Sequence, residues 1–94
     1  MDIRKKIRNI PDFPKPGILF RDITTLLQDH DAFKYVIDTL TERCKNLGID
    51  VIVGIEARGF IIGAPVAYNM GAAFVPIRKK SKLPSKTIST SYDL

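Results

Sequence analysis

The residues best suited to chemistry in this sequence are cations that follow two apolar runs. The first run ends in Gly54-Ile55-Glu56-Ala57-Arg58-Gly59, and the second is followed by Arg78-Lys79-Lys80-Ser81-Lys82. Arginine binds phosphate oxygens through a fork of N–H donors, whereas lysine binds them as a point charge. These residue types therefore indicate a site for an anion, although an ordinary turn and a solvated basic loop are the simpler interpretations of each stretch alone.

The distribution of charge supports an anionic partner. Residues 1–56 hold nine Lys or Arg and nine Asp or Glu, whereas residues 57–94 hold six and one, so the net charge of +5 lies in the later part. A phosphorylated small molecule, a nucleic acid and an acidic lipid surface all fit this asymmetry.

Composition excludes several classes of protein. The 94 residues are 45% hydrophobic, which suits one small globular domain. The longest apolar stretch, 59–70, is too short to cross a bilayer, and the amino terminus carries charges where a signal peptide needs an apolar core. We therefore expect a soluble, cytoplasmic protein. Cys44 is the single cysteine, so an internal disulfide is excluded.

Two strands and a helix must position the cations. The β-branched run 51–55 predicts a buried strand, and 73–77 predicts a second. The segment between them, 59–70, predicts a helix in which Pro65 either makes a kink or marks the first turn of a shorter helix from about 64. A strand, helix and strand of this length form a parallel βαβ unit whose strand ends converge, so Arg58 and Arg78 are expected to face one ligand.

The remaining segments predict further elements of an α/β domain. Isoleucines at helical spacing predict a basic helix over about 2–9, and three prolines make 11–17 an extended arm or turn that displays Phe13. An apolar stripe predicts a helix over 33–47, capped by Asp29 or Asp31 and ended by Gly48. The segment 87–92 alternates weakly, as an exposed or edge strand does. One face or edge of this sheet is expected to be uncovered, so we infer a piece of a larger domain; a complete small domain that oligomerises is the alternative.

A third candidate site is the segment 13–22, Phe-Pro-Lys-Pro-Gly-Ile-Leu-Phe-Arg-Asp. Irregular backbone beside an aromatic face can read the edge of a flat heterocycle. The simpler interpretation is a surface arm that packs Phe13 and Phe20 onto the core.

Together these stretches resemble the adenine phosphoribosyltransferase family. The resemblance is carried by Pro-Asp-Phe-Pro-Lys-Pro-Gly-Ile-Leu-Phe-Arg-Asp-Ile-Thr (11–24), Val-Gly-Ile-Glu-Ala-Arg-Gly-Phe (53–60), Phe-Val-Pro-Ile-Arg-Lys-Lys-Ser-Lys-Leu-Pro (74–84) and Ser-Tyr-Asp-Leu (91–94). It implies part of the type I phosphoribosyltransferase fold, a parallel sheet flanked by helices with an N-terminal hood. Residues 1–28 would form the N-terminal helix and the adenine-side hood, and residues 29–94 the first part of an incomplete core.

The resemblance also implies an activity. Members of the family take part in purine salvage by transferring the phosphoribosyl group of 5-phosphoribosyl 1-pyrophosphate to adenine, which gives AMP and pyrophosphate. Magnesium binds with the donor, and the enzyme is usually a cytoplasmic homodimer. Adenine, the donor and a second subunit are thus the implied partners, with neither nucleic acid nor membrane among them.

Site residues follow from the resemblance by position. The backbones of Leu19 and Arg21 would hydrogen-bond adenine, with Phe20 packing on its ring. The pyrophosphate loop would be Glu56-Ala57-Arg58, with a cis peptide between Glu56 and Ala57. Further pyrophosphate or phosphate contacts would come from Arg78, Lys79 and Lys82.

No catalytic residue is expected within the 94 residues. In the family, the glutamate that handles the adenine proton follows the stretch that Ser91–Leu94 resembles, and an Asp-Asp strand and a Thr-Gly-Gly turn that bind the donor come later still. We therefore expect residues 1–94 alone to be inactive. The alternative function is a non-catalytic module on the same fold that recognises an anionic ligand or nucleic acid.

Overall fold

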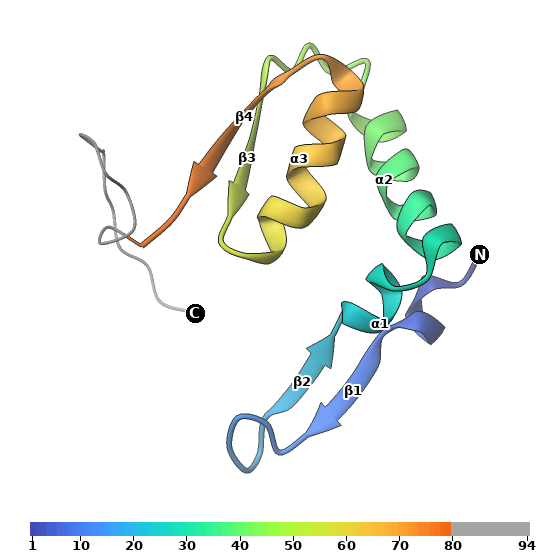
Figure 1. The fold of residues 1–94 in the computed structure, drawn as a ribbon, viewed down its shortest axis with the longest axis vertical. Coiled ribbons are helices and arrows are strands. Elements are labelled where there is room, and N and C mark those ends of the chain that lie inside the picture. Colours follow the sequence, from blue (N-terminus) through green and yellow to red (C-terminus); the bar gives the residue numbers. More distant parts are fainter. Residues whose placement is uncertain (80–94) are drawn as a thin grey trace. The chain divides into compact units, whose positions relative to one another are not determined.

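The computed structural model describes residues 1–79, which form two compact units, one of residues Met1–Arg43 and one that begins at Cys44 (Figure 1). The functional division expected after residue 28 stays a prediction. The chain order is η1 (Ile3–Lys6), β1 (Arg8–Pro11), β2 (Leu19–Asp22), α1 (Thr24–Leu27), α2 (His30–Cys44), β3 (Val51–Ile55), α3 (Arg58–Met70) and β4 (Ala73–Ile77).

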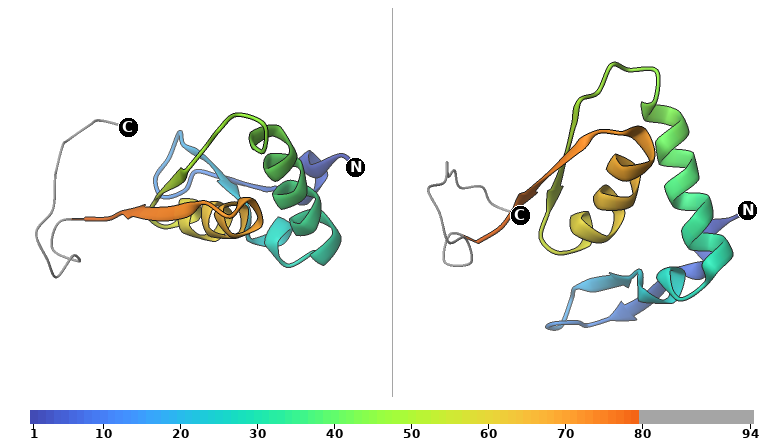
Figure 2. Two further views of the ribbon diagram at one scale, coloured as in Figure 1. Left: turned by 90° about the horizontal axis from the view of Figure 1, so that it is seen from above. Right: turned by 45° about the horizontal axis from the view of Figure 1, so that its top comes forward.

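The amino-terminal helix predicted over about 2–9 is wrong beyond its first turn. Asp2 caps a single 3-10 turn, η1, by accepting a hydrogen bond from the Arg4 backbone N–H at 3.1 Å. The chain then enters β1, which pairs antiparallel with β2 (Figure 2). In this register Arg8 lies opposite Asp22, and Pro11 lies opposite Leu19. The strand prevails because pairing with β2 satisfies backbone groups that a short isolated helix leaves open.

The proline-rich segment between β1 and β2 is a closed loop. The Phe13 N–H donates to the Ile18 carbonyl at 3.1 Å, and the Gly17 N–H donates to Asp12 Oδ1 at 3.0 Å. Gly17 has a φ of +88°, a conformation that glycine adopts without strain. The loop leaves Phe13 49% exposed, as its predicted display requires.

Of the two predicted caps for α2, the structure uses Asp29. Its Oδ1 accepts from the backbone N–H groups of Asp31 and Ala32 at 3.1 and 3.2 Å. The helix ends at Cys44, earlier than the apolar stripe predicts, and Leu47 is 68% exposed. Residues Leu26, Ala32 and Ile37 form the buried core of this unit.

The second unit is a βαβ arrangement. The structure confirms the two predicted strands with their bounds, and they pair in parallel from Val51 opposite Ala73 to Ile55 opposite Ile77. Between them α3 packs against β3 and β4. It runs through Pro65 from Arg58 to Met70, so the longer of the two predicted helices is correct, and it ends at Gly71 with a φ of +69°.

Small residues bring α3 close to the sheet. A Cβ atom on Gly54 would lie 2.5 Å from the Gly59 carbonyl oxygen and 2.6 Å from Phe74 Cζ, and one on Gly63 would lie 2.8 Å from Phe74 Cε1. The Phe74 ring therefore occupies the space that side chains on these glycines would take.

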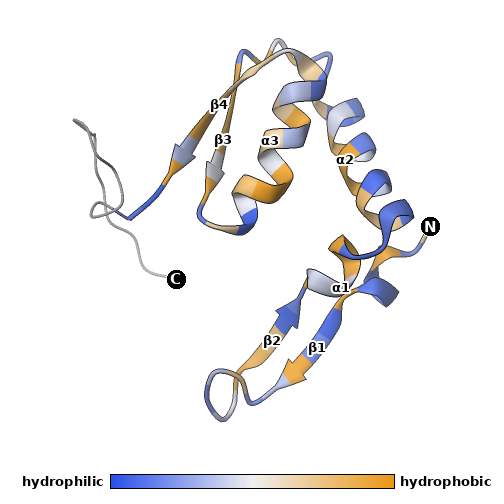
Figure 3. Ribbon diagram, in the orientation of Figure 1, coloured by the Kyte–Doolittle hydropathy of each residue, from blue (hydrophilic) through white to orange (hydrophobic). Residues whose placement is uncertain are grey.

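The strands of the second unit are apolar along most of their length (Figure 3). On β3 the alternate residues Val51, Val53 and Ile55 are 46 to 54% exposed. Within residues 1–79 the prediction of a buried strand is therefore wrong for this face, because α3 packs on the other one, whereas the prediction of an uncovered face is confirmed. Within residues 1–79, no helix has the length and apolar character needed to cross a membrane.

Candidate functional site

The carboxyl ends of β3 and β4 bring three of the sequence-predicted residues together. Ile55 is opposite Ile77, so Glu56 and Arg78 leave the sheet side by side. The Glu56 N–H donates to the Ile77 carbonyl at 3.0 Å. In return, Glu56 Oε1 accepts from the Lys79 N–H at 3.2 Å and lies 4.0 Å from Arg78 Nε. The Glu56 carboxylate thus fastens the start of the basic segment to the end of β3.

Arg58 is placed at the amino end of a helix. The Glu56–Ala57 peptide is cis, which confirms the expectation from the resemblance, and α3 begins at the next residue. Ala57, in the capping position, makes no side-chain hydrogen bond to the first turn. An amino terminus of this kind attracts anions, because its N–H groups and the positive end of the helix dipole point outward.

Phe60 is a residue of this edge to which sequence reasoning gave no role. Its ring lies 5.9 Å from the Arg78 guanidinium carbon and contacts Phe74 edge-on, with the ring centroids 6.1 Å apart. A guanidinium over an aromatic face is held by cation–π attraction. Phe60 thereby limits where Arg78 can point, and the available signal was an aromatic residue in the first turn of α3.

The three residues assigned to adenine lie on β2 of the first unit. Proline has no N–H, so Pro11 and Leu19 cannot form a hydrogen-bonded pair in the antiparallel ladder. Since hydrogen-bonded pairs alternate with open ones, Leu19 and Arg21 turn their backbone N–H and C=O groups to the outer edge of β2. In the described residues, no strand pairs with that edge.

Phe20 lies between these two residues and is half-buried. Phe13 contacts it edge-on, with ring centroids 5.2 Å apart and an angle of 73° between the planes. Both aromatic residues of the third candidate segment therefore pack together, beside the open backbone edge.

Asp22, at the end of β2, is a residue that sequence reasoning missed. Its side chain accepts from the Thr24 N–H and Oγ1 at 2.9 and 2.6 Å, and from Arg8 Nε and Nη2 at 3.1 and 2.5 Å. The Thr24 hydroxyl, then the Thr24 amide and Arg8, lower the pKa of Asp22 to about 2. The only sequence signal was its spacing of two residues from Thr24.

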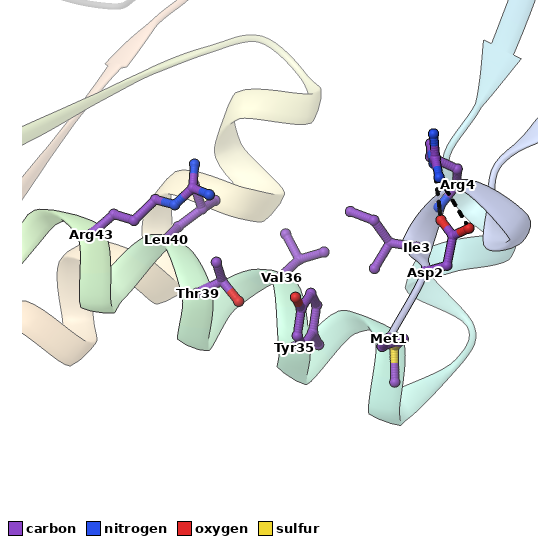
Figure 4. Close-up of a pocket in the computed structure, with 9 residues that line it drawn as sticks. All are labelled: Met1, Asp2, Ile3, Arg4, Tyr35, Val36, Thr39, Leu40 and Arg43. Atoms are coloured by element: carbon purple, nitrogen blue, oxygen red, sulfur yellow. Dashed lines mark hydrogen bonds and ion pairs between the residues drawn. The ribbon is translucent and has the colours of Figure 1, made fainter.

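The first unit also has a groove of about 410 Å³, and none of the predicted site residues lines it. Arg4 on its rim is paired with Asp2 (Figure 4). Lys82 and the predicted strand 87–92 lie outside the described residues. Among the described residues, no cluster of three His, Cys, Asp or Glu side chains could hold a metal ion.

Comparison with known proteins gives consistent matches. All 94 residues align with an adenine phosphoribosyltransferase of Clostridium tetani at 62% identity, covering 55% of that protein, and with one of Nostoc punctiforme at 58%, covering 56%. The chain thus spans about half the length of these curated relatives. No protein-family model matches it.

Solved structures give the same result. The crystal structure of adenine phosphoribosyltransferase from Thermoanaerobacter pseudethanolicus superposes with a TM-score of 0.92 at 50% identity, over 98% of this chain and 55% of that one. The enzyme from Saccharomyces cerevisiae, complexed with adenine and an imino-altritol bisphosphate, superposes with a TM-score of 0.84 at 35% identity, over 90% and 53%. The α/β fold with a parallel sheet is therefore that of the type I phosphoribosyltransferases.

Proposed function

We propose that the protein containing these 94 residues transfers the phosphoribosyl group to adenine in purine salvage. The premise is that this chain is homologous along its whole length to adenine phosphoribosyltransferases. The donor is 5-phosphoribosyl 1-pyrophosphate, and the products are AMP and pyrophosphate. The observation that carries the proposal is the meeting of Glu56, Arg78 and Lys79 at the carboxyl edge of β3 and β4. Arg58 begins α3 two residues after Glu56, and that it faces the same ligand as Arg78 is part of the proposal.

This edge suits a departing polyanion. As the bond between ribose carbon 1 and pyrophosphate breaks, positive charge develops on the ribose and negative charge on the leaving group. We assign stabilisation of the leaving group to Arg58, Arg78 and Lys79 together with the amino end of α3, because fixed cations and N–H dipoles act without reorganising. Lys82 is proposed as a further phosphate contact on the basis of the resemblance.

The outer edge of β2 suits the acceptor. We assign the backbone groups of Leu19 and Arg21 to hydrogen bonds with the edge of adenine, and the ring of Phe20 to packing on its face. Alternating donors and acceptors on an open strand edge match the alternating nitrogens and amino group of a purine. Adenine then attacks carbon 1 of the ribose through a ring nitrogen.

Three parts of the proposal rest on the family resemblance. We assign Mg²⁺ to binding together with the donor, as the resemblance implies, and derive no step for it. The acid that handles the adenine proton is assigned to sequence beyond Leu94. A cytoplasmic homodimer is proposed on the same ground.

The test is product formation by the native protein that contains residues 1–94. We expect AMP and pyrophosphate in equal amounts from adenine and the donor, and much less product from hypoxanthine or guanine. The absence of AMP would overturn the proposal. Binding of RNA or DNA with a steep salt dependence in its place would favour the non-catalytic module, because counterion release scales with the phosphates contacted.

A further inference from the structure

Asp22 is buried, with 7% of its surface exposed, and it is the one charged residue among the described residues that is buried to this degree. We propose that Asp22 is a positioning residue for the acceptor base, one that holds the open edge of β2 in place through Arg8 and Thr24. The inference rests on the proposed function, because it assumes that the backbones of Leu19 and Arg21 read adenine.

The two oxygens of the carboxylate divide their partners between two elements. Oδ1 accepts both hydrogen bonds from Thr24, at the first residue of α1. Oδ2 accepts both hydrogen bonds from the Arg8 guanidinium, on β1. One side chain therefore ties both strands of the hairpin to the helix that follows it, and charged hydrogen bonds of this type are the strong ones.

The Asp22 carboxylate is a main attachment of the hairpin to the rest of its unit. A two-stranded hairpin is marginally stable by itself, and the residues of β1 and β2 other than Asp22 are exposed or half-buried. Thr25 Oγ1 donates to the Lys6 carbonyl at 2.5 Å, and Lys6 Nζ pairs with Asp29 at 2.8 Å, but both contacts precede β1. Within the strands, Asp22 provides attachment through its carboxylate and also through its carbonyl, which lies 3.5 Å from Thr25 Oγ1.

The Asp22 side chain is next in sequence to Arg21, whose backbone belongs to the outer edge of β2 that is proposed to bind adenine. Arg8 lies opposite Asp22 in the ladder. Loss of the Asp22 hydrogen bonds should therefore displace the end of β2. Because base recognition depends on hydrogen-bond directions, a misplacement of about 1 Å can cost about a hundredfold in rate. Losing the cluster should therefore weaken adenine recognition before it affects the donor side.

The experiment compares Asp22→Asn with Asp38→Asn in the native protein. The Asp38 variant removes an exposed pair with Lys34 on α2 and is the matched control for the change from carboxylate to amide. We expect Asp22→Asn to raise the KM for adenine at least about tenfold, with the KM for the donor within about twofold. The control should change neither.

Thr24 provides a second pair of variants if Asp22→Asn does not fold. Thr24→Val removes the hydroxyl with little change of shape and should raise the KM for adenine. Thr24→Ser keeps the hydroxyl and should have a KM for adenine close to that of the native protein. If the Asp22 cluster had only a structural role, the variants would have a lower free energy of unfolding, but the KM for adenine would not rise more than the KM for the donor. An unchanged KM for adenine, or an equal rise for both substrates, would overturn the inference.

Hydrogen exchange separates this inference from the proposed function. In Asp22→Asn the backbone amides of Ile10 and Phe20 should exchange at least about tenfold faster, with those of α3 unchanged, because the hairpin opens more often. If the native protein makes no AMP, the proposed function fails, and this exchange result still decides whether Asp22 holds the hairpin. Unchanged exchange at Ile10 and Phe20 would refute that part as well.

Discussion

Gly54→Ala should weaken binding of the donor by displacing the first turn of α3, which holds Arg58. The new Cβ would lie 2.5 Å from the Gly59 carbonyl oxygen, and Cβ contacts under 3.0 Å essentially never occur, so this contact must open by at least half an ångström. The Gly59 carbonyl is backbone in the first turn of α3, directly after Arg58. The variant must therefore displace the segment proposed to bind pyrophosphate.

The expected size of the effect follows from these distances. Forcing extra atoms into a packed site costs about 1–3 kcal/mol of unfolding free energy. A displacement of half an ångström at Arg58 should raise the KM for the donor about tenfold, since a full ångström can cost about a hundredfold. The KM for adenine should stay within about twofold, because the residues assigned to adenine belong to the first unit.

Gly63→Ala is the matched control. Its Cβ would lie 2.8 Å from Phe74 Cε1 and 3.5 Å from Ile52 Cγ2, which are side-chain atoms. Because the Gly54 Cβ also lies 2.6 Å from Phe74 Cζ, both variants crowd the Phe74 ring, and only Gly54→Ala meets the Gly59 carbonyl. Gly63→Ala should also be destabilising, and it should raise the KM for the donor less than Gly54→Ala does. Urea unfolding gives the stabilities, and steady-state kinetics gives both KM values. An equal KM for the donor in the two variants would refute the reasoning.

Three further predictions concern single side chains. Gly71→Ala should lower the free energy of unfolding by about 1 kcal/mol in urea melts, because Gly71 has a φ of +69° and no atom within 4 Å that a Cβ would meet. Asp22, whose pKa is lowered to about 2, should stabilise the fold above about pH 4, and this contribution should disappear as the pH falls from about 4 to about 2. Urea unfolding at several pH values should show a flatter profile over that window for Asp22→Asn, and an unchanged slope would contradict the assignment. Glu56→Gln should leave the Lys79 contact in place while removing the charge beside Arg78, so the KM for the donor should change less than about threefold, whereas Glu56→Ala should raise it about tenfold.

The second unit was predictable because its signals are local. Each strand is one continuous run of mainly apolar residues, mostly β-branched in 51–55, and Gly71 marks the end of the helix between them. Parallel pairing predicted that the two strand ends converge, and Glu56 and Arg78 do leave the sheet side by side, but the contact of Glu56 with Arg78 and Lys79 was not predicted. The cis peptide after Glu56 was accessible only through the family resemblance.

The first unit was less predictable because its structure depends on distant partners. The isoleucines near the amino terminus have helical spacing, yet β1 forms because β2, beyond a proline-rich loop, supplies its hydrogen bonds. The burial of Asp22 has the same origin, since Arg8 reaches it from the opposite strand. In the second unit, the contact of Phe60 with Arg78 was missed for the same reason, because it joins residues far apart in the sequence. Neither hydrophobic period nor turn chemistry reveals such pairs.

The most direct test of the central claim measures both KM values in two variants of the native protein. Arg58→Ala removes a cation at the proposed pyrophosphate loop, and Phe20→Ala removes the ring proposed to pack on adenine. Because Arg58 is assigned to the pyrophosphate group of the bound donor as well as to the leaving group, the account predicts that Arg58→Ala raises the KM for 5-phosphoribosyl 1-pyrophosphate by at least about tenfold and leaves the KM for adenine unchanged, and that Phe20→Ala does the reverse. Variants that both raise the same KM, or that leave both unchanged, would contradict it.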